Sequence, residues 1–151
     1  MDEQPTRLKQ SARAVQAALD AAKINTEVVQ LPDSTRTVKN AANAIGCSVA
    51  QIAKSIVFRA VESNRTILVI ASGTNRINEA LLGSHLGEGI EKATADQVRT
   101  ATGYAIGGVP PCGHVAPLKI FLDQDLLDLK EMWAAAGTPN AVFRLTPEQL
   151  V

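Results

Sequence analysis

Residues 107–114, "GGVPPCGH", combine backbone-shaping residues with two side chains that could do chemistry. The glycines permit backbone angles that other residues resist, and the adjacent prolines fix φ and remove two N–H donors. We therefore expect a rigid loop whose remaining amides and carbonyls point in fixed directions. Such a loop can present backbone groups to a ligand or turn the chain between two strands, and these residues alone favour neither. The sequence contains neither a Walker loop nor a dinucleotide-binding fingerprint.

Cys112 and His114 are the side chains of this loop that could react. His114 could act as a general acid or base or orient a ligand, but a structural role within the loop is the simpler interpretation. Cys112 could be a nucleophile activated by His114, although a lone cysteine is more often a small apolar filler. His85 falls in a predicted helix and is expected at the surface. The histidines and cysteines lack the spacing of metal ligands, so we expect no metal site and no cofactor.

Lys54 is a cation set in an apolar stretch, between Ile52-Ala53 and Ile56-Val57. Its aliphatic stem could simply carry the charged end out to solvent. The other interpretation is an ammonium held at the mouth of a pocket, where it would grip a phosphate or a carboxylate. No Ser/His/Asp arrangement and no pair of carboxylates stands out as an alternative.

The composition restricts the kinds of protein that this chain can be. Its 151 residues carry 15 basic and 15 acidic side chains, which argues against a strongly basic nucleic-acid-binding protein but permits a local basic patch. Two widely separated cysteines and a polar start predict a reduced, cytoplasmic protein without a membrane partner. No apolar run is long enough for a transmembrane helix. Candidate phosphate contacts are Arg36, Lys39, Arg59, Arg76 and Lys119.

The first half of the chain predicts two helices and a hairpin around Lys54. Apolar residues at helical spacing predict a helix over 6–23, followed by a strand over 27–31 and a helix over 37–45 that Gly46 ends. Ser48 and Gln51 form a capping box that predicts a short helix ending at Lys54. Strands are expected at 56–58 and 67–71, and the polar turn at 62–65 joins them as a hairpin.

The second half predicts the elements around the glycine-proline loop. We expect a helix over 78–86, a short strand over 90–93 and a helix from Thr94 to about residue 100. Strands at 104–106 and 118–122 would flank the loop, followed by a helix over 125–136, a strand over 141–145 and a helix from 146. The fold class predicted is α/β of the α+β type: one compact domain over 1–151 with a mixed, largely antiparallel sheet flanked by helices.

Three stretches together resemble the YbaK/ProX family of aminoacyl-tRNA deacylases and the related editing domain of bacterial prolyl-tRNA synthetases. They are "GCSVAQIAKSIVF" (46–58), "LVIASG" (68–73) and "ATGYAIGGVPPCGH" (101–114), and "WAAAGTPNAVFRLTP" (133–147) extends the match. The specific feature is the pairing of the lysine in A-K-S-x-V-F with T-G-Y-x-x-G-G-x-x-P-x-G. The resemblance covers the chain from about residue 10.

The resemblance implies an enzyme that hydrolyses the ester between a wrong amino acid and tRNA. Members remove alanine, cysteine, serine or threonine, mostly from proline tRNA, and their substrate partner is the 3′ end of aminoacyl-tRNA. It implies that Lys54 holds the 3′-terminal nucleotide, that Gly107 and Gly108 offer backbone groups to the reacting centre, and that a ribose hydroxyl of the tRNA assists the attacking water. Further substrate-binding candidates are Leu31, Thr35, Thr37, Ser55, Pro110 and His114.

Departures from the family pattern leave the substrate open. Ser72-Gly73 stands where many members have Gly-Asp, and the alanines at 134–136 with Val142 replace polar and acidic residues, which disfavours a cysteine-specific enzyme. A non-catalytic module that binds tRNA ends or a synthetase is the alternative function, and a cysteine hydrolase built on Cys112 and His114 is a third; DNA is not an expected partner. The editing hypothesis requires Lys54 and the 107–114 bend to border one cavity.

Overall fold

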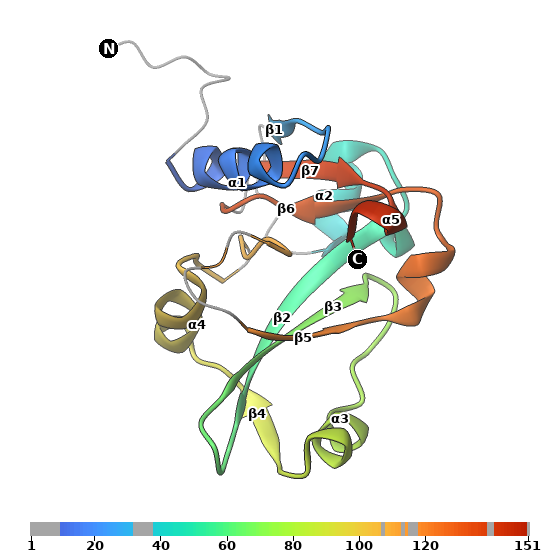
Figure 1. Ribbon diagram of the computed structural model, residues 1–151. Helices are drawn as coiled ribbons and strands as arrows, with labels where there is room; N and C mark the ends of the chain where they lie inside the picture. Colours follow the sequence, from blue (N-terminus) through green and yellow to red (C-terminus); the bar gives the residue numbers. More distant parts are fainter. Residues whose placement is uncertain are drawn as a thin grey trace.

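The computed structural model describes residues 10–31, 38–106, 108–112, 114, 118–138 and 141–150. Helices and strands alternate along these residues without a regular repeat (Figure 1). Their bounds in chain order are α1 Gln10–Ala21, β1 Val28–Gln30, α2 Val38–Ile45, the 3-10 helix η1 Val49–Gln51, β2 Ile52–Ala60, β3 Thr66–Ser72, α3 Glu79–Leu86, β4 Ile90–Lys92, α4 Ala95–Thr102, β5 Lys119–Leu122, the 3-10 helix η2 Gln124–Asp128, β6 Met132–Ala135, β7 Ala141–Leu145 and α5 Pro147–Leu150.

The strands form one mixed sheet in the order β1-β7-β6-β2-β3-β5, and β4 pairs with β2 outside this path. β2 and β3 form the predicted hairpin, which projects away from the end of the sheet that holds β1, β7 and β6 (Figure 1). The β2–β6 and β3–β5 pairings are parallel, and the other pairings are antiparallel. The expected mixed, largely antiparallel sheet flanked by helices is confirmed.

β2 separates two faces of the sheet, because successive side chains of a strand point to opposite sides. Ala53 and Val57 pack into the cluster that α1 covers, so Ser55 points to the same side, here called the Ser55 face. Ile56 and Phe58 pack into the cluster that α3 covers, so Lys54 points to that side, here called the Lys54 face. Lys54 and Ser55 are therefore neighbours in β2 whose side chains point to opposite faces of the sheet.

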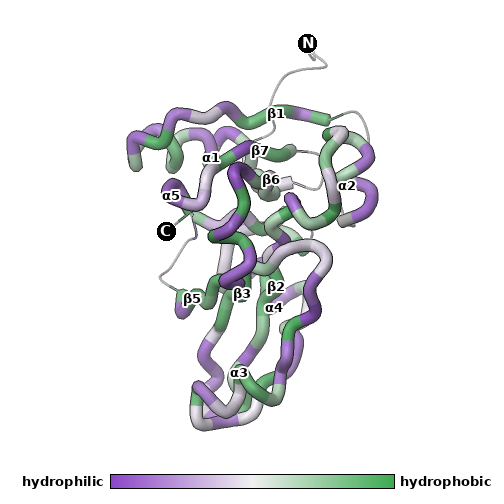
Figure 2. The backbone as a smooth tube through the Cα atoms, turned by 90° about the vertical axis from the view of Figure 1, so that its right-hand side faces the viewer, coloured by the Kyte–Doolittle hydropathy of each residue, from purple (hydrophilic) through white to green (hydrophobic). Residues whose placement is uncertain are grey.

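Aliphatic side chains of the helices bury both faces. On the Ser55 face, Ala12, Val15 and Leu19 of α1 are fully or almost fully buried, in agreement with their predicted helical spacing. On the Lys54 face, Leu82 of α3 packs near the hairpin, and α2 packs over the other end of β2. Figure 2 shows mainly hydrophobic colouring along β6 and β7, and the strand order places these two strands between β1 and β2. Each fully buried large aliphatic side chain contributes about 1.5–3 kcal/mol.

One edge of β2 is shared by two strands that do not meet. β6 pairs with Ile52 and Ala53, and β4 pairs with β2 only from Phe58 to Ala60. Residues 54–57 therefore have no strand partner on this edge among the described residues. β3 pairs along the whole opposite edge, from Ala53 to Arg59. The sheet is thus open at its centre, beside Lys54 and Ser55.

The predicted short helix ending at Lys54 is wrong in its extent. The capping box is present, and Gln51 Oε1 accepts the N–H of Ser48 at 3.0 Å, but the helical turn ends at Gln51. β2 begins at Ile52, four residues earlier than predicted, because the β-branched residues of this stretch fit a pleated surface and β6 offers them a partner. Lys54 consequently lies inside a strand.

Two further predictions near the loop and the C-terminal end are wrong. The helix expected over 125–136 is the short η2 followed by β6, because pairing with β2 and β7 overrides the helix preference of its alanines. Residues 104–106 form no strand: the N–H of Tyr104 donates to the Thr102 hydroxyl at 3.0 Å, and that hydroxyl donates to the carbonyl of Val98 in α4 at 2.7 Å. The remaining predicted elements are found close to their expected bounds.

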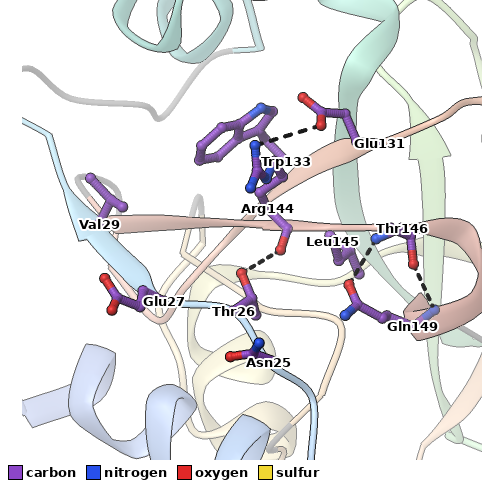
Figure 3. Close-up of a pocket in the computed structure, with 10 residues that line it drawn as sticks. All are labelled: Asn25, Thr26, Glu27, Val29, Glu131, Trp133, Arg144, Leu145, Thr146 and Gln149. Carbon is purple, nitrogen blue, oxygen red and sulfur yellow. Dashed lines mark hydrogen bonds and ion pairs between the residues drawn. The ribbon is translucent and has the colours of Figure 1, made fainter.

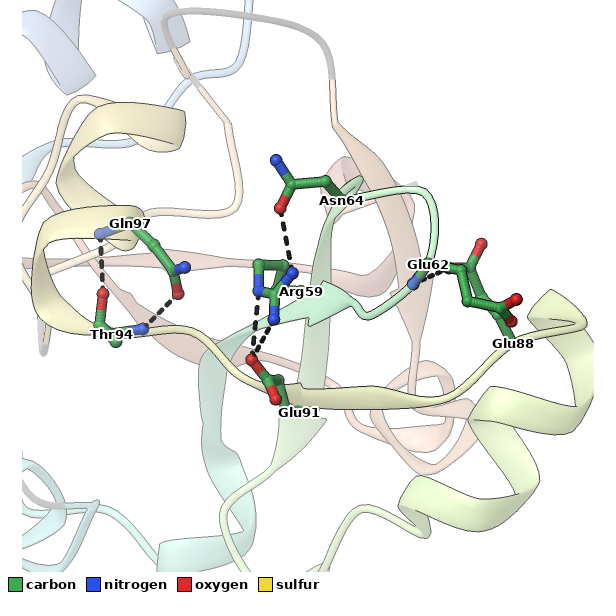
Figure 4. A network of polar contacts seen from close by, with 7 residues as sticks. All are labelled: Arg59, Glu62, Asn64, Glu88, Glu91, Thr94 and Gln97. Atoms are coloured by element: carbon green, nitrogen blue, oxygen red, sulfur yellow. Dashed lines mark hydrogen bonds and ion pairs between the residues drawn. The ribbon is translucent and has the colours of Figure 1, made fainter.

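The tip of the hairpin is fastened to the segment that follows α3 (Figure 4). Glu88 Oε1 accepts the backbone N–H groups of Glu62 and Ser63 at 2.9 and 2.8 Å, and Oε2 lies 3.2 Å from Arg65 Nη2. Arg59 pairs with Glu91 across the β2–β4 ladder. One carboxylate thus satisfies the donors of a turn that is distant from it in sequence, and this fixes the position of β4 relative to β2.

Candidate functional site

Lys54 extends over its face of the sheet toward the turn that follows β3. Its Nζ donates to the carbonyl of Asn75 at 2.5 Å. Partial burial lowers the pKa of Lys54; the carboxylate of Asp123 opposes this shift, and the charges of Arg76 and Lys92 add to it. The positive charges of Arg76 and Lys92 and the negative charge of Asp123 therefore all act on this ammonium.

Asp123 organises the turn that receives Lys54. Its Oδ2 accepts the N–H of Ser72 at 3.0 Å and the side-chain amide of Asn75 at 2.7 Å. Burial acts to raise the pKa of Asp123, but these hydrogen bonds, the N–H of Asp125 and the charge of Lys54 together hold it below its usual value. The carboxylate stays ionised and locks the Ser72–Asn75 turn against the end of β5.

A cavity of about 410 Å³ adjoins this turn on the Lys54 face. Asn75, Arg76 and Asp123 form its polar side, and the exposed His85 lies at its rim. Its apolar lining comes from β3, β5 and α3 and comprises Val69, Ala71, Ile77, Leu81, Leu82, Phe121 and Leu122. Lys54 pairs in register with Ala71 of this lining, so the ammonium lies beside the cavity.

A smaller cavity, of about 200 Å³, occupies the open edge of β2. Its lining joins the two faces of the sheet, since Ser55 and Val57 belong to one face while Ile56 and Lys92 belong to the other. Ile106 and Val109 of the glycine-proline loop close it from outside, together with Ala93 and Val98. The hydroxyl oxygen of Ser55 is buried and has no hydrogen-bond partner among the described residues. The cavity is therefore apolar apart from one unused hydroxyl and a lysine.

Gly108 anchors the loop to the β6–β7 connection. Its carbonyl accepts the N–H of Gly137 at 2.8 Å. A Cβ at position 108 would lie 2.8 Å from the Cα of Thr138, a separation that no real side chain tolerates. Close backbone packing, rather than an unusual φ, requires glycine here. This contact holds the loop beside residues 54–57 of β2, where neither β6 nor β4 pairs with that strand.

The reactive side chains of the loop have structural surroundings. His114 Nε2 lies 2.7 Å from the carbonyl of Pro110, and burial lowers the pKa of His114 while this hydrogen bond opposes the shift. Burial raises the pKa of the Cys112 thiol, which packs against the core of the Ser55 face. A protonated, half-buried thiol is a poor nucleophile, so the structure disfavours a cysteine hydrolase.

The structure brings together only part of the predicted site. Ser55 shares a cavity with the bend, whereas Lys54 points to the opposite face and does not line that cavity. That Lys54 and the bend border one cavity stays a prediction, because part of the bend lies outside the described residues; Lys92 lines the cavity at Ser55 and its charge also acts on Lys54. Pro110 is buried, and the half-buried Leu31 lines neither cavity. Thr35, Thr37 and Gly107 lie outside the described residues.

Sequence reasoning missed Asn75 and Asp123 and treated Arg76 only as one of five candidate phosphate contacts. A signal was present: a polar Ser-Gly-Thr-Asn-Arg stretch follows one apolar strand, and an aspartate ends another. The parallel β3–β5 pairing brings these two strand ends together. Of the other candidates, Arg59 is paired with Glu91, and the Lys119 ammonium lies 5.7 Å from the ring centre of Phe121; Arg36 lies outside the described residues.

Among the described residues, no three His, Cys, Asp or Glu side chains gather in an arrangement that could hold a metal ion. No helix there is both long and apolar enough to cross a lipid bilayer.

Comparison with known proteins places these features in a wider group. The family described as the aminoacyl-tRNA editing domain matches residues 32–151. The uncharacterized protein YwhH of Bacillus subtilis is 33% identical over 124 residues, which are 82% of this chain and 78% of that protein. The proline–tRNA ligase of Lactobacillus acidophilus is 28% identical over 109 residues, 72% of this chain but only 19% of the ligase. A crystal structure described as a proposed trans-editing enzyme for prolyl-tRNA synthetase has a TM-score of 0.89 and 48% identity, with 95% of this chain and 91% of that chain covered.

Proposed function

This chain belongs to the aminoacyl-tRNA editing domain family, and we propose on that basis that it is a trans-editing hydrolase. It deacylates mischarged aminoacyl-tRNA, with proline tRNA carrying alanine, serine, threonine or cysteine as the expected substrate. Two comparisons support the free-standing form and the proline identity. The chain aligns over most of the length of YwhH and of a structure described as a proposed trans-editing enzyme, and one relative is named a proline–tRNA ligase.

The observation that carries the proposal is the group of cations on the Lys54 face. Lys54, Arg76 and Lys92 lie close enough for their charges to interact, and Asp123 is the carboxylate among them. Such a group attracts a phosphate, because each contact releases a counterion from the nucleic acid. Asn75 holds the Lys54 ammonium at the 410 Å³ cavity, which is large enough for a terminal nucleoside. In the proposal Lys54 and Arg76 grip the 3′-terminal phosphate or ribose.

The 200 Å³ cavity is proposed as the acyl pocket. Its volume suits a small amino acid and is too small for a nucleotide. Lys92 lines this cavity and also lies on the Lys54 face. In the proposal the acyl group therefore extends from the Lys54 face, past Lys92, toward Ser55 and the loop. Backbone groups of Gly107 and Gly108 are proposed to face the ester from the loop. The buried Ser55 hydroxyl is available to bind a polar atom of the amino acid.

The proposed reaction needs positioning rather than a protein nucleophile. A water oxygen attacks the ester carbonyl carbon, the bond from that carbon to the ribose oxygen breaks, and the released ribose oxygen takes up one proton of the water to become a hydroxyl. The neighbouring ribose hydroxyl of the tRNA assists the water. A hydroxyl of the turn that receives Lys54, Ser72 Oγ, is buried and donates to the carbonyl of Ala50 at 2.8 Å. Fixed charges and dipoles can supply rate enhancements of about 10²–10³ per group.

Deacylation of a panel of mischarged tRNAs tests the proposal. The wild type should clear at least one small amino acid from proline tRNA faster than buffer alone, and Lys54→Ala should reduce this rate by about 100-fold. Lys130→Ala, which removes an exposed lysine of the segment before β6, is the matched control and should leave the rate unchanged. If no substrate is cleared although uncharged tRNA binds, the chain is a binding module and the hydrolase assignment is wrong.

A further inference from the structure

The largest of the described cavities, about 630 Å³, lies apart from the groups assigned so far. It sits on the Lys54 face at the β1–β7–β6 end of the sheet, with the loop before β1 and the start of α5 at its border (Figure 3). It is lined by Asn25, Thr26, Glu27, Val29, Glu131, Trp133, Arg144, Leu145, Thr146 and Gln149. We propose that this cavity binds an unpaired base of the tRNA 3′ strand, one that precedes the terminal nucleotide; the identity of the ligand as tRNA rests on the proposed function.

Trp133 supplies the stacking surface. It is half-buried, and it packs on the α2 side against the cluster of Ala41, Ala42 and Ile52. This packing holds the indole in place while it also lines the cavity (Figure 3). A base of any identity can stack on such a fixed aromatic ring, because every base has a π-face. Val29, which is 41% exposed, extends the apolar surface next to it.

The polar lining suits the edge of a base better than a phosphate. Arg144 and Glu131 face each other at 3.7 Å, and their side chains remain 60% and 41% exposed, so this pair is loose enough to exchange partners. Glu27 adds a second carboxylate, which gives two anionic side chains and one cationic one. Carboxylates repel phosphate but accept hydrogen bonds from the amino groups of cytosine and adenine. The base therefore enters the cavity, and its phosphates stay outside.

The position of Trp133 relative to Lys54 fits a continuous strand of RNA. Trp133 pairs in register with Ile52 in the parallel β2–β6 ladder. Ile52 and Lys54 lie two residues apart on the same face, which is about 7 Å along a strand. α2 packs over Trp133 and Ile52. With the terminal nucleotide at the cation group, a preceding nucleotide can reach the cavity around α2.

Trp133 is the single tryptophan of the chain, so its fluorescence reports on this cavity directly. We expect cytidine monophosphate and a single-stranded RNA trinucleotide ending in CCA to quench it, with inorganic phosphate causing no change. Raising the salt concentration should weaken the effect of cytidine monophosphate by less than twofold, because few phosphate contacts form. Arg144→Ala and Glu131→Gln, both at exposed positions where folding should be unaffected, should raise the trinucleotide Kd at least threefold.

Kinetics separate this inference from the proposed function. Trp133→Phe should raise KM for mischarged tRNA several-fold and leave kcat unchanged, and it should have no effect on an aminoacyl-adenosine substrate that lacks the preceding nucleotides. Lys54→Ala should still show quenching by cytidine monophosphate. Absence of quenching by every nucleotide overturns the inference even if deacylation is observed. Quenching by a lysine-rich peptide and not by nucleotides would also overturn it, because the carboxylates would then serve a cationic protein partner.

Discussion

At the scale of single residues, the main feature of the candidate site is that Lys54 and Ser55 point to opposite faces of the sheet. They are neighbours in β2, yet one directs an ammonium to the turn at Asn75 and the other directs a hydroxyl to the cavity under the loop. The motif that contains them was recognisable in the sequence, and a functional role of Lys54 is predicted from it. Their assignment to opposite faces was not, because the predicted short helix placed Lys54 outside a strand, where the alternation of faces does not apply.

The Ser55 hydroxyl gives a prediction in which stability and activity change in opposite directions. A buried hydroxyl without a partner costs about 1–3 kcal/mol of desolvation, so Ser55→Ala should raise the free energy of unfolding by about 1 kcal/mol. The same change should slow removal of serine more than removal of alanine, since only serine offers a hydroxyl to bind. Urea unfolding and deacylation of both esters measure this, with the exposed Ser84→Ala as control.

A loss of stability in Ser55→Ala would show that the hydroxyl has a partner within the fold. An unchanged ratio between the serine and alanine rates would show that the hydroxyl does not contact the amino acid. The second result would remove Ser55 from the acyl pocket while leaving the role of Lys54 intact.

At the scale of elements, β2 and its two incomplete neighbours create the place for the loop. Local signals predicted the hairpin, the helices with caps and the strand at β7, because those signals lie within each segment. β6 could not be predicted in this way: its alanines favour a helix, and only the strands on either side of it make it a strand. The opening beside residues 54–57 follows from that non-local pairing, so it too lay beyond sequence reasoning.

The fastening of the hairpin tip by Glu88 predicts a pH dependence of stability. The N–H of Ser63, with Arg65 and Glu62, holds the pKa of Glu88 below its ordinary value. A carboxylate with a lowered folded-state pKa adds stability above its unfolded-state pKa of about 4.3, and this stability is lost as the pH falls through the folded-state value. Glu88→Gln should therefore be less stable than the wild type at pH 7, and the difference should shrink toward pH 3.

Urea midpoints at pH 7 and pH 3 measure this difference. Glu62→Gln changes an equal charge in the same turn without removing the fastening carboxylate, so its midpoint should follow the wild type at both values. If the urea midpoint of Glu88→Gln lies below that of the wild type by the same amount at both pH values, the carboxylate acts through its shape and not through its charge.

At the scale of the whole molecule, a chain with balanced charge gathers cations at one place. Fifteen basic and fifteen acidic side chains predict no attraction for RNA as a whole. In the folded chain the charges of Arg76 and Lys92, which belong to other elements or turns, act on Lys54, and composition cannot reveal this. The fold class and the resemblance that implied editing were accessible from sequence, whereas the two cavities, the Asp123 turn and the Trp133 surface required the spatial arrangement.

The most direct test of the account is a single-turnover measurement with protein in excess over mischarged proline tRNA. At saturating protein the rate reports the chemical step and not binding. We predict that Lys54→Met slows this step by about 100-fold, and that Lys54→Arg, which keeps the charge, retains a larger share of the rate. An unchanged rate in Lys54→Met at saturation would contradict the account, because the ammonium would then contribute nothing to hydrolysis.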